Sequence, residues 1–399
     1  MIYKPFLHTL RRQSTRLYSS LPGENVLATP RTGSKLLNRK NIAGMSLNEL
    51  TKELLSNVEG MKLFAPKQIW EWMYKKGAND FTPMSNLPIN IRENLEKNYC
   101  IDHGFVQHDV TSKLDETRKF LISYNKPNEV IETVFIPEPT RGTQCVSSQI
   151  GCSLSCTFCH TGTQKLIRNL TASEIVGQYM ILASRLGEFP FTPNHQRKVS
   201  NMVFMGQGEP LYNYRNVSKA IQILTDPRGI ALPKARITIS TSGVVPAIEK
   251  IPAELGVSLA ISLHAVTDSV RDQIVPINKT WPIKELMNAC RNFVRLADEK
   301  TKRITFEYVM LDGINDSLAD AKELSRMLKE LPSHVNLIPF NPWPGSSYKC
   351  SPEARLQQFA DIVNEGGTRA TIRRPRGRDI LAACGQLKSN VLSKAQRQA

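Results

Sequence analysis

Three cysteines, Cys152, Cys156 and Cys159, lie close together in the pattern Cys-x3-Cys-x2-Cys. Three thiolates can bind three irons of a four-iron cluster, whereas a plain electron carrier binds its cluster through four. The fourth iron is then free to bind a substrate, so the spacing predicts a catalytic site as well as a site of electron transfer. A structural zinc site with His160 as fourth ligand is the alternative. Zinc sites more often pair two cysteine knuckles across a longer gap, and the sequence has no second knuckle.

Beyond residue 140, segments of strand length alternate with segments of helical periodicity. This alternation predicts a parallel sheet with crossover helices, and six strands suit a partial (β/α)6 barrel. The expected strands are 145–150, 202–205, 237–239, 257–263, 304–311 and 335–340, and the expected helices are 171–186, 217–224, 245–251, 283–296 and 319–329. Reactive groups gather at the carboxyl ends of such strands, where the cysteine motif is expected to lie.

Composition and periodicity divide the chain into five units. Residues 1–44 are expected to be a leader and linker. Residues 45–100 are expected to form a small helical accessory domain, because leucines recur there at helical spacing. Residues 101–137 change to a period of two and are expected to form a short β extension. The α/β core is expected over 138–383, and a C-terminal tail over 384–399.

The chain carries a formal net charge of +16. Its first 40 residues hold eight basic residues and one acidic residue and are rich in Ser and Thr, which is typical of mitochondrial transit peptides. We therefore predict a protein of the mitochondrial matrix, with a basic RNA-binding arm and a cytoplasmic location as the alternative. The remaining chain is also basic, so a polyanionic partner is expected. No stretch approaches the ~18 uninterrupted apolar residues of a membrane span, so no membrane partner is expected.

Further motifs accompany the expected strands and the C-terminal region. They are Cys145-Val-Ser-Ser-Gln-Ile-Gly-Cys152, Met205-Gly-Gln-Gly-Glu-Pro210, Ser240-Thr-Ser-Gly-Val-Val-Pro246, Ile261-Ser-Leu-His264, Asn336-Leu-Ile-Pro-Phe-Asn341 and Ala383-Cys-Gly-Gln-Leu387. Each motif is weak alone, but together and in this order they make the chain resemble the radical S-adenosylmethionine (SAM) enzymes. Over roughly residues 46–390 it is similar to the RlmN-type adenine-C2 methyltransferases of large-subunit ribosomal RNA. The resemblance implies a radical SAM core with the partial (β/α)6 barrel.

The resemblance also implies two cofactors, a [4Fe-4S] cluster and SAM. The cluster ligands would be Cys152, Cys156 and Cys159. The positions that match cofactor contacts in the family are Gly208, Glu209, Ser240, Ser262, Leu263, His264 and Asn341. These residue types suit the cofactor, because Gly208 and Glu209 offer a carbonyl and a carboxylate to its ammonium group.

Three more residues match the catalytic positions of the family: Cys384, Cys145 and Glu132. The resemblance implies that one SAM methylates Cys384, and that a second SAM yields a radical that activates this methyl group for addition to C2 of adenine. Cys145 would then help to break the protein–RNA adduct, and Glu132 would accept a proton. A carboxylate within the apolar segment 130–136 is costly unless it has a partner, and an exposed strand face is the alternative reading of Glu132.

The expected function is therefore the formation of 2-methyladenosine in large-subunit rRNA, with tRNA as a second candidate substrate and two SAM consumed per methylation. The family implies a monomer and an electron donor such as a flavodoxin or ferredoxin system. Methylation of adenine C8 by a related enzyme, and a non-catalytic RNA-binding factor for ribosome assembly, are the alternatives. A basic run before Cys384 would contact RNA phosphates or form a solvated surface; it comprises Arg373, Arg374, Arg376 and Arg378.

Overall fold

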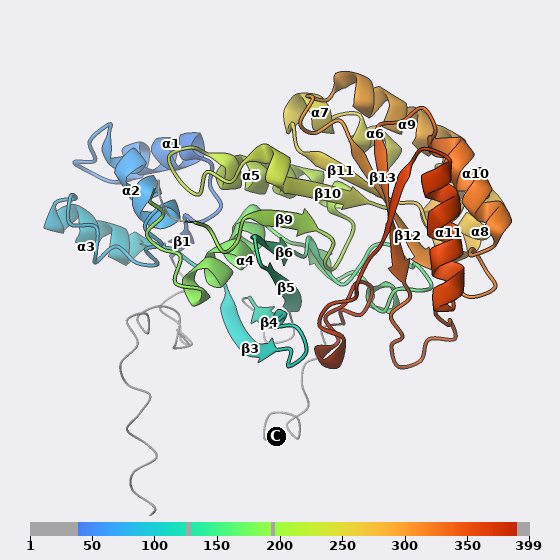
Figure 1. The fold of residues 1–399 in the computed structure, drawn as a ribbon. Coiled ribbons are helices and arrows are strands. Elements are labelled where there is room, and N and C mark those ends of the chain that lie inside the picture. Colours follow the sequence, from blue (N-terminus) through green and yellow to red (C-terminus); the bar gives the residue numbers. More distant parts are fainter. Residues whose placement is uncertain (1–38, 125–128, 193–195, 389–399) are drawn as a thin grey trace, which may run out of the picture.

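A computed structural model describes residues 39–124, 129–192 and 196–388 of the chain (Figure 1). Most of the predicted leader and of the predicted C-terminal tail lies outside these residues. Within the described ranges, no helix is both long and apolar enough to cross a membrane. The predicted limits of the five units stay predictions.

The described chain is built around one mixed sheet of ten strands, in the order β14-β13-β12-β11-β10-β9-β6-β5-β4-β3. The parallel strands are β6 Arg141–Cys145, β9 Asn201–Phe204, β10 Ile237–Thr241, β11 Ser258–Ser262, β12 Ile304–Met310, β13 Ser333–Pro339 and β14 Arg369–Ile372. The antiparallel strands beyond β6 are β5 Val130–Glu138, β4 Arg118–Ser123 and β3 Phe105–Thr111. The predicted α/β fold is confirmed, and β14 is a parallel strand that was not predicted.

Helices connect the parallel strands, and α9, α10 and α11 lie outside strands β11–β13 (Figure 1). The helices of this part are α4 Ala172–Arg185, α5 Tyr214–Thr225, α6 Val245–Ile248, α7 Ile251–Glu254, α8 Asp268–Ile274, α9 Ile283–Leu296, α10 Leu318–Leu328 and α11 Glu353–Glu365. Helix α9 shows why they pack there: Leu286, Cys290 and Phe293 recur at helical spacing and are fully buried in the core.

Two predicted elements differ from the observed ones. The strand expected at 145–150 ends at Cys145, because the N–H of Ser147 donates to the Gln178 side chain instead of a neighbouring strand. The chain then forms the short pair β7 Gln149–Ile150 and β8 Arg168–Asn169. The helix expected at 245–251 is the two short helices α6 and α7, because Pro252 has no N–H with which to continue the first helix.

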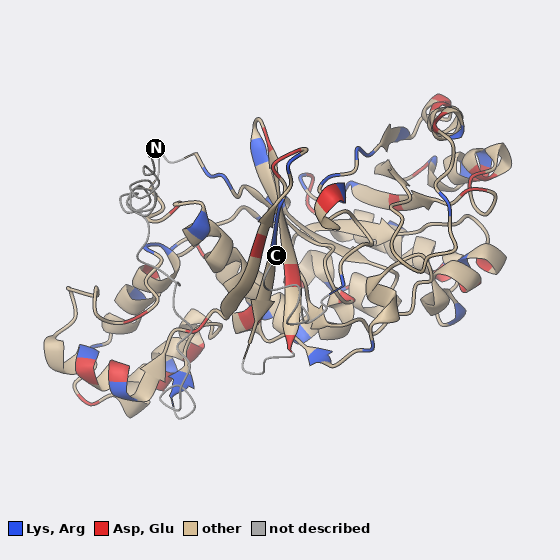
Figure 2. Cartoon of the chain, turned by 90° about the horizontal axis from the view of Figure 1, so that it is seen from below, with Lys and Arg blue, Asp and Glu red and all other residues tan. Residues whose placement is uncertain are grey.

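The N-terminal helices are α1 Leu47–Asn57, α2 Ala65–Tyr74 and α3 Ile89–Asn98, next to the small parallel pair β1 Lys40–Asn41 and β2 Tyr99–Cys100. Ser46 and Glu49 form a capping box that begins α1, and this helix buries Leu50 and Leu54. Basic and acidic residues are interspersed on these helices (Figure 2). The three helices α1, α2 and α3 confirm the helical character that was predicted for this segment.

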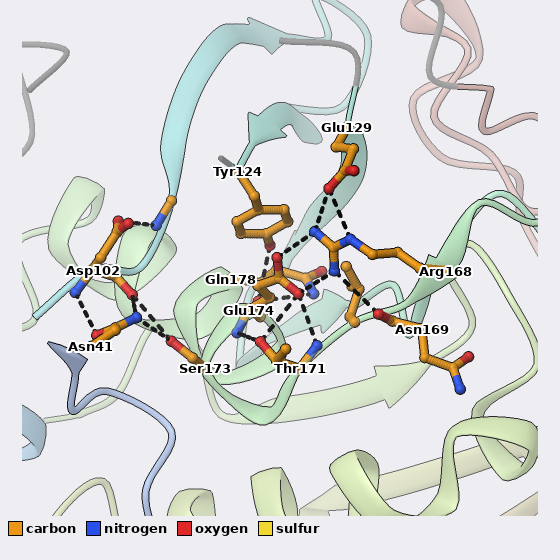
Figure 3. A network of polar contacts seen from close by, with 12 residues as sticks. Asn41, Asp102, Tyr124, Glu129, Arg168, Asn169, Thr171, Ser173, Glu174 and Gln178 are labelled. Carbon is orange, nitrogen blue, oxygen red and sulfur yellow. Dashed lines mark hydrogen bonds and ion pairs between the residues drawn. The ribbon is translucent and has the colours of Figure 1, made fainter. Parts of the chain in front are cut away.

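Arg168 joins three parts of the fold that are distant in sequence (Figure 3). Its Nη1 and Nη2 donate to the two carboxylate oxygens of Glu174, both at 2.7 Å. Its Nε donates to Glu129 at 2.8 Å. Glu174 also closes the capping box of α4 by accepting from the N–H of Thr171. The guanidinium thus connects β8 to the first turn of α4 and to the segment just before β5.

A second part of this network connects the N-terminal region to α4 (Figure 3). The Asn41 side chain donates to the Asp102 carbonyl at 2.9 Å and to Ser173 Oγ at 3.1 Å. Ser173 in turn donates to the same Asp102 carbonyl. The helical region is therefore fixed to the core by directional polar contacts.

We predict that Arg168→Met lowers the free energy of unfolding by about 3 kcal/mol, because it leaves two carboxylates buried without their cation. The side chains of Glu129 and Glu174 are only 10% and 11% exposed. Urea unfolding followed by circular dichroism would measure this loss. Arg326→Met is the matched control, since Arg326 pairs with Glu323 on the surface and its loss should have a much smaller effect. Equal losses would contradict the assigned role of Arg168.

A second prediction concerns His103, which is buried and has no hydrogen-bond partner for either ring nitrogen among the described residues. Burial lowers the pKa of His103 to about 4, and nearby Asp102 opposes this shift only in part. The unfolded chain therefore binds a proton that the folded chain does not as pH falls from 6.5 toward 4. We expect His103 to contribute a loss of stability of about 3 kcal/mol across that window. His103→Leu should remove this contribution in urea titrations, and an unchanged pH dependence would contradict it.

Candidate active site

A pocket of about 980 Å³ lies where the parallel strands end. The predicted site residues that line it are Cys152, Cys156, Cys159, Gly208, Glu209, Ser240, Ser262, His264, Asn341 and Cys384. Leu263 does not line the pocket, because side chains alternate between the two faces of an extended segment and its own is fully buried in the core. Cys145 and Glu132 lie beside this pocket and are described below.

The loop of the three cysteines follows β7 and turns back into β8. The N–H of Cys152 donates to the Gln164 carbonyl at 3.3 Å, and the N–H of Cys159 donates to the Cys156 carbonyl at 3.1 Å. Burial raises the pKa of Cys152 to about 11, and burial also raises the pKa values of Cys156 and Cys159. Thiols held in this way need a positively charged partner to ionise, so the donor set fits an iron–sulfur cluster.

The zinc alternative fits this arrangement less well. No group of three His, Cys, Asp or Glu side chains in the described ranges is arranged to hold a single metal ion. The three thiols nevertheless line one pocket. The His160 ring stacks on Trp343 at 4.6 Å, and its Nδ1 lies 3.3 Å from the Gln386 carbonyl. His160 therefore contacts the C-terminal segment and does not line the pocket of the cysteines.

The turn after β9 brings backbone and carboxylate groups to the pocket. Gly208 has φ +93°, and a Cβ there would lie 2.4 Å from Cβ of Gln149, so only glycine fits. The carboxylate of Glu209 accepts hydrogen bonds from the N–H groups of Ser242, at 2.8 Å, and Leu211, at 3.1 Å. Burial nevertheless raises the pKa of Glu209 to about 7. A bound ammonium group would favour its ionised form.

His264 is held as a neutral imidazole at the end of β11. Burial, together with the charge of Arg271, lowers the pKa of His264 to about 3. The N–H of Val309 donates to its Nδ1 at 3.0 Å. The ring proton is therefore on Nε2, which leaves a hydrogen-bond donor for a ligand in the pocket.

The segment that carries Cys384 is fixed against the pocket from both sides. The Asn341 side chain donates to the Cys384 carbonyl at 3.2 Å, and the N–H of His160 donates to the Gly385 carbonyl at 2.8 Å. On the other side, the carboxylate of Asp379 accepts a hydrogen bond at 2.7 Å from the hydroxyl of Ser112, which lies between β3 and β4. The loop of the cysteines and the β extension thus hold the same C-terminal segment.

Cys384 also lines a second, adjoining pocket of about 700 Å³, together with Cys145. Burial raises the pKa of Cys145 to about 12, and the neighbouring Cys384 adds to this shift. The Cys145 carbonyl accepts a hydrogen bond from the Thr133 hydroxyl at 2.8 Å, which ties the end of β6 to β5. Both cysteines are free thiols. Cys384 therefore lies between the pocket of the three cysteines and the pocket of Cys145.

Glu132 lies in β5 and lines neither pocket. It is only 6% exposed, so it does not lie on an exposed strand face. Its Oε1 is 3.1 Å from Nζ of Lys119 in β4. It occupies the same face of β5 as Val134, two residues along the strand, which does line the second pocket.

Two charged residues of the site were not assigned to it from the sequence, Arg373 and Glu307. Arg373 follows β14 and lines both pockets, whereas the basic run had suggested RNA contact or a solvated surface. Glu307 in β12 lines the first pocket and lies 3.9 Å from Arg373. The Cys384 thiol and Glu307 raise the pKa of Arg373, so it remains a cation next to Cys384. Its position at the end of a short strand was the signal that could have revealed it.

Two family models match the chain. The model of the radical SAM superfamily matches residues 146–324, and the model of the ribosomal RNA large subunit methyltransferase N-terminal domain matches residues 40–101. The chain is similar to a crystal structure of a radical SAM methyltransferase from Sphaerobacter thermophilus, with a TM-score of 0.80 and 40% identity. That match covers 88% of this chain and 99% of the other.

The chain is also similar to curated bacterial proteins described as dual-specificity RNA methyltransferase RlmN. The protein of Chelativorans sp. (strain BNC1) is 48% identical over 386 residues, which covers 93% of each chain. The protein of Gluconobacter oxydans (strain 621H) is 51% identical over 363 residues, which covers 90% of this chain and 87% of the relative. The resemblance found from the motifs is therefore confirmed.

The predicted location in the mitochondrial matrix is wrong by this comparison. The relatives at about 50% identity are proteins of bacteria, which have no mitochondria. The alternative, a cytoplasmic location, fits them. The basic composition that suggested a transit peptide falls mainly on residues 1–38, outside the described ranges.

We predict that the protein, reconstituted with iron and sulfide without oxygen, binds about four irons per chain. Cys156→Ser should lose most of this iron and the visible absorption of the cluster, because only two of the three cysteine ligands remain to hold it. Cys350→Ser is the control, since Cys350 does not line the pocket, and it should retain both. Stoichiometric zinc in a colourless protein would support the alternative instead.

Proposed function

We propose, from the premise that this chain belongs to the RlmN family of radical SAM RNA methyltransferases, that it methylates C2 of adenine in large-subunit rRNA and in tRNA. The relatives named above are called dual-specificity RNA methyltransferases. The observation that supports the proposal best is the placement of Cys384, which lines the pocket of the three cysteines and the pocket of Cys145. A residue that carries a methyl group has to reach both the SAM that donates the group and the RNA that accepts it.

The family uses a [4Fe-4S] cluster and SAM, and together these supply a methyl group and a radical that abstracts hydrogen. The residues of the first pocket would hold them. Cys152, Cys156 and Cys159 would hold the cluster, and the other predicted residues of the pocket would hold SAM: Gly208, Glu209, Ser240, Ser262, His264 and Asn341. Glu209, with a pKa near 7 in the buried pocket, would ionise against the ammonium group. His264 would donate from Nε2.

The second pocket would be the place where RNA is modified. Cys384 would carry the methyl group there. To release the product, the Cys145 sulfur would lose its proton and bond to the Cys384 sulfur, while the bond from that sulfur to the transferred carbon breaks. The electron pair of the broken bond would stay on the carbon, which takes a proton and becomes the methyl group of the product. Arg373 lines both pockets as a cation. It would keep a positive charge beside Cys384, the residue that would accept the methyl group.

Glu132 is proposed as the proton acceptor, on the evidence of its burial and of its position beside the second pocket. We also propose that the enzyme is a monomer and that a small electron-transfer protein of the flavodoxin or ferredoxin class reduces it. The C8 methyltransferase and the non-catalytic RNA-binding factor are less well supported, because the relatives over most of the chain are RlmN proteins.

We predict that the reconstituted protein, given reductant, methyl-labelled SAM and unmodified RNA, forms labelled 2-methyladenosine. The substrates would be a fragment of large-subunit rRNA and, in parallel, tRNA, and nucleoside mass spectrometry would identify the product. Cys384→Ala should abolish the product, because no residue remains to carry the methyl group. Labelled 8-methyladenosine would support the alternative position, and full activity of Cys384→Ala would contradict the proposed mechanism.

A further inference from the structure

The carboxylate of Glu132 is held asymmetrically. Its Oε1 forms the ion pair with Lys119 at 3.1 Å, whereas its Oε2 is buried and has no hydrogen-bond partner in the described part of the chain. A buried carboxylate oxygen without a partner is costly. Such an exception to full hydrogen bonding leaves Oε2 able to contact a further group.

Lys119 makes a second contact that reaches the segment of the methyl carrier. Its Nζ donates to the Leu381 carbonyl at 3.3 Å, three residues before Cys384. The Lys119 side chain is 17% exposed, and that of Glu132 is 8% exposed. One partly buried ammonium group thus connects the carboxylate in β5 to the C-terminal segment.

The backbone of Glu132 is also held in place, by hydrogen bonds to Gln207 and Ser147. Its N–H donates to Oε1 of Gln207 at 3.1 Å, and its carbonyl accepts from the Ser147 hydroxyl at 2.6 Å. Gln207 lies between Gly206 and Gly208 in the turn after β9. Ser147 also accepts from the N–H of Gln207 at 2.9 Å. The strand position of Glu132 is therefore set independently of Lys119, which leaves Lys119 to fix the orientation of the carboxylate.

Lys119 is suited to fix the direction in which this carboxylate points. Among the described residues, Lys119 is the cation within ion-pair distance of Glu132, and it contacts Oε1. Oε2 is therefore the oxygen that is left to accept a proton. Without Lys119, no ion pair would hold the two oxygens in these places.

We propose that Lys119 is a positioning residue for Glu132, holding Oε1 so that Oε2 is free to take the proton from C2 of the target adenine. The inference rests on the proposed function. In this step the carbon that Cys384 delivers has already bonded to C2. The C2–H bond then breaks, its proton moves to Oε2 of Glu132, and its electron pair stays on the purine. The one unpaired electron that radical addition left on the purine would pass to the iron–sulfur cluster. Through Leu381, the same lysine keeps the acceptor aligned with the carrier segment.

The test compares three variants of the full-length reconstituted protein: Lys119→Met, Lys119→Arg and Lys113→Met. Lys119→Met keeps much of the side-chain volume but removes the charge. Lys119→Arg restores a cation. Lys113→Met is the matched control, because Lys113 lies between β3 and β4 on the same hairpin and is exposed.

We expect Lys119→Met to retain the cluster and the methylation of Cys384, measured by peptide mass spectrometry, because neither depends on Glu132. Formation of 2-methyladenosine should fall about 100-fold, the order of magnitude that a positioned general base contributes. Removal of the proton from C2 should then limit the rate more strongly. With RNA deuterated at C2 of the target adenine, the primary isotope effect on product formation should therefore be larger in this variant than in the wild type. Lys119→Arg should recover most of the rate, and Lys113→Met should match the wild type.

Loss of methylation at Cys384 in Lys119→Met would overturn the inference, since it would mean that Lys119 supports the fold or an earlier step. A rate within a factor of two of the wild type would overturn it too, as would a slow variant with no larger isotope effect than the wild type. Failure of the wild-type protein itself to form 2-methyladenosine would instead overturn the proposed function, so the two failures are distinguishable.

Discussion

The ion pairs of Arg168 with Glu174 and Glu129 hold together the parts from which the candidate site is assembled. Arg168 ends the loop of the three cysteines, Glu174 begins α4, and Glu129 precedes the strand that carries Glu132. The two carboxylates have low exposure, and the Arg168 guanidinium compensates for the desolvation of both. Their geometry therefore fixes the base of the cysteine loop relative to the β extension.

From this base, the site is built by elements with different roles. The parallel strands place Ser240, Ser262 and His264 in the lining of the pocket, and the cysteine loop lines it as well. The ring of Phe158 in that loop lies 4.7 Å from the ring of His264. The β extension adds Glu132 and supports the C-terminal segment through Asp379. Cys384 is the point at which all of these elements meet, since it contributes to both pockets.

The sequence motifs predicted most of the pocket, because each follows a strand whose apolar pattern is strong. They did not reveal Arg373, because β14 has only four residues and merges with a basic run. Glu307 was missed because it lies inside the apolar strand β12. Its carboxylate accepts a hydrogen bond from the Asn336 side chain at 2.9 Å, and this partner lies on the neighbouring strand β13. Leu263 was included with its neighbours, although strand geometry turns its side chain into the core. The partner of Glu132 could not be predicted either, because pairing of Lys119 depends on the register of β4 and β5.

The position of Cys384 after β14 has a consequence for biosynthesis. During translation Cys152, Cys156, Cys159 and all strands of the sheet emerge before Cys384 does. If Cys384 is the methyl carrier, as proposed, a chain terminated between β14 and Cys384 would keep the three cysteines of the loop but would have no residue to pass a methyl group to RNA. The proposed function would therefore depend on intact synthesis of the last segment.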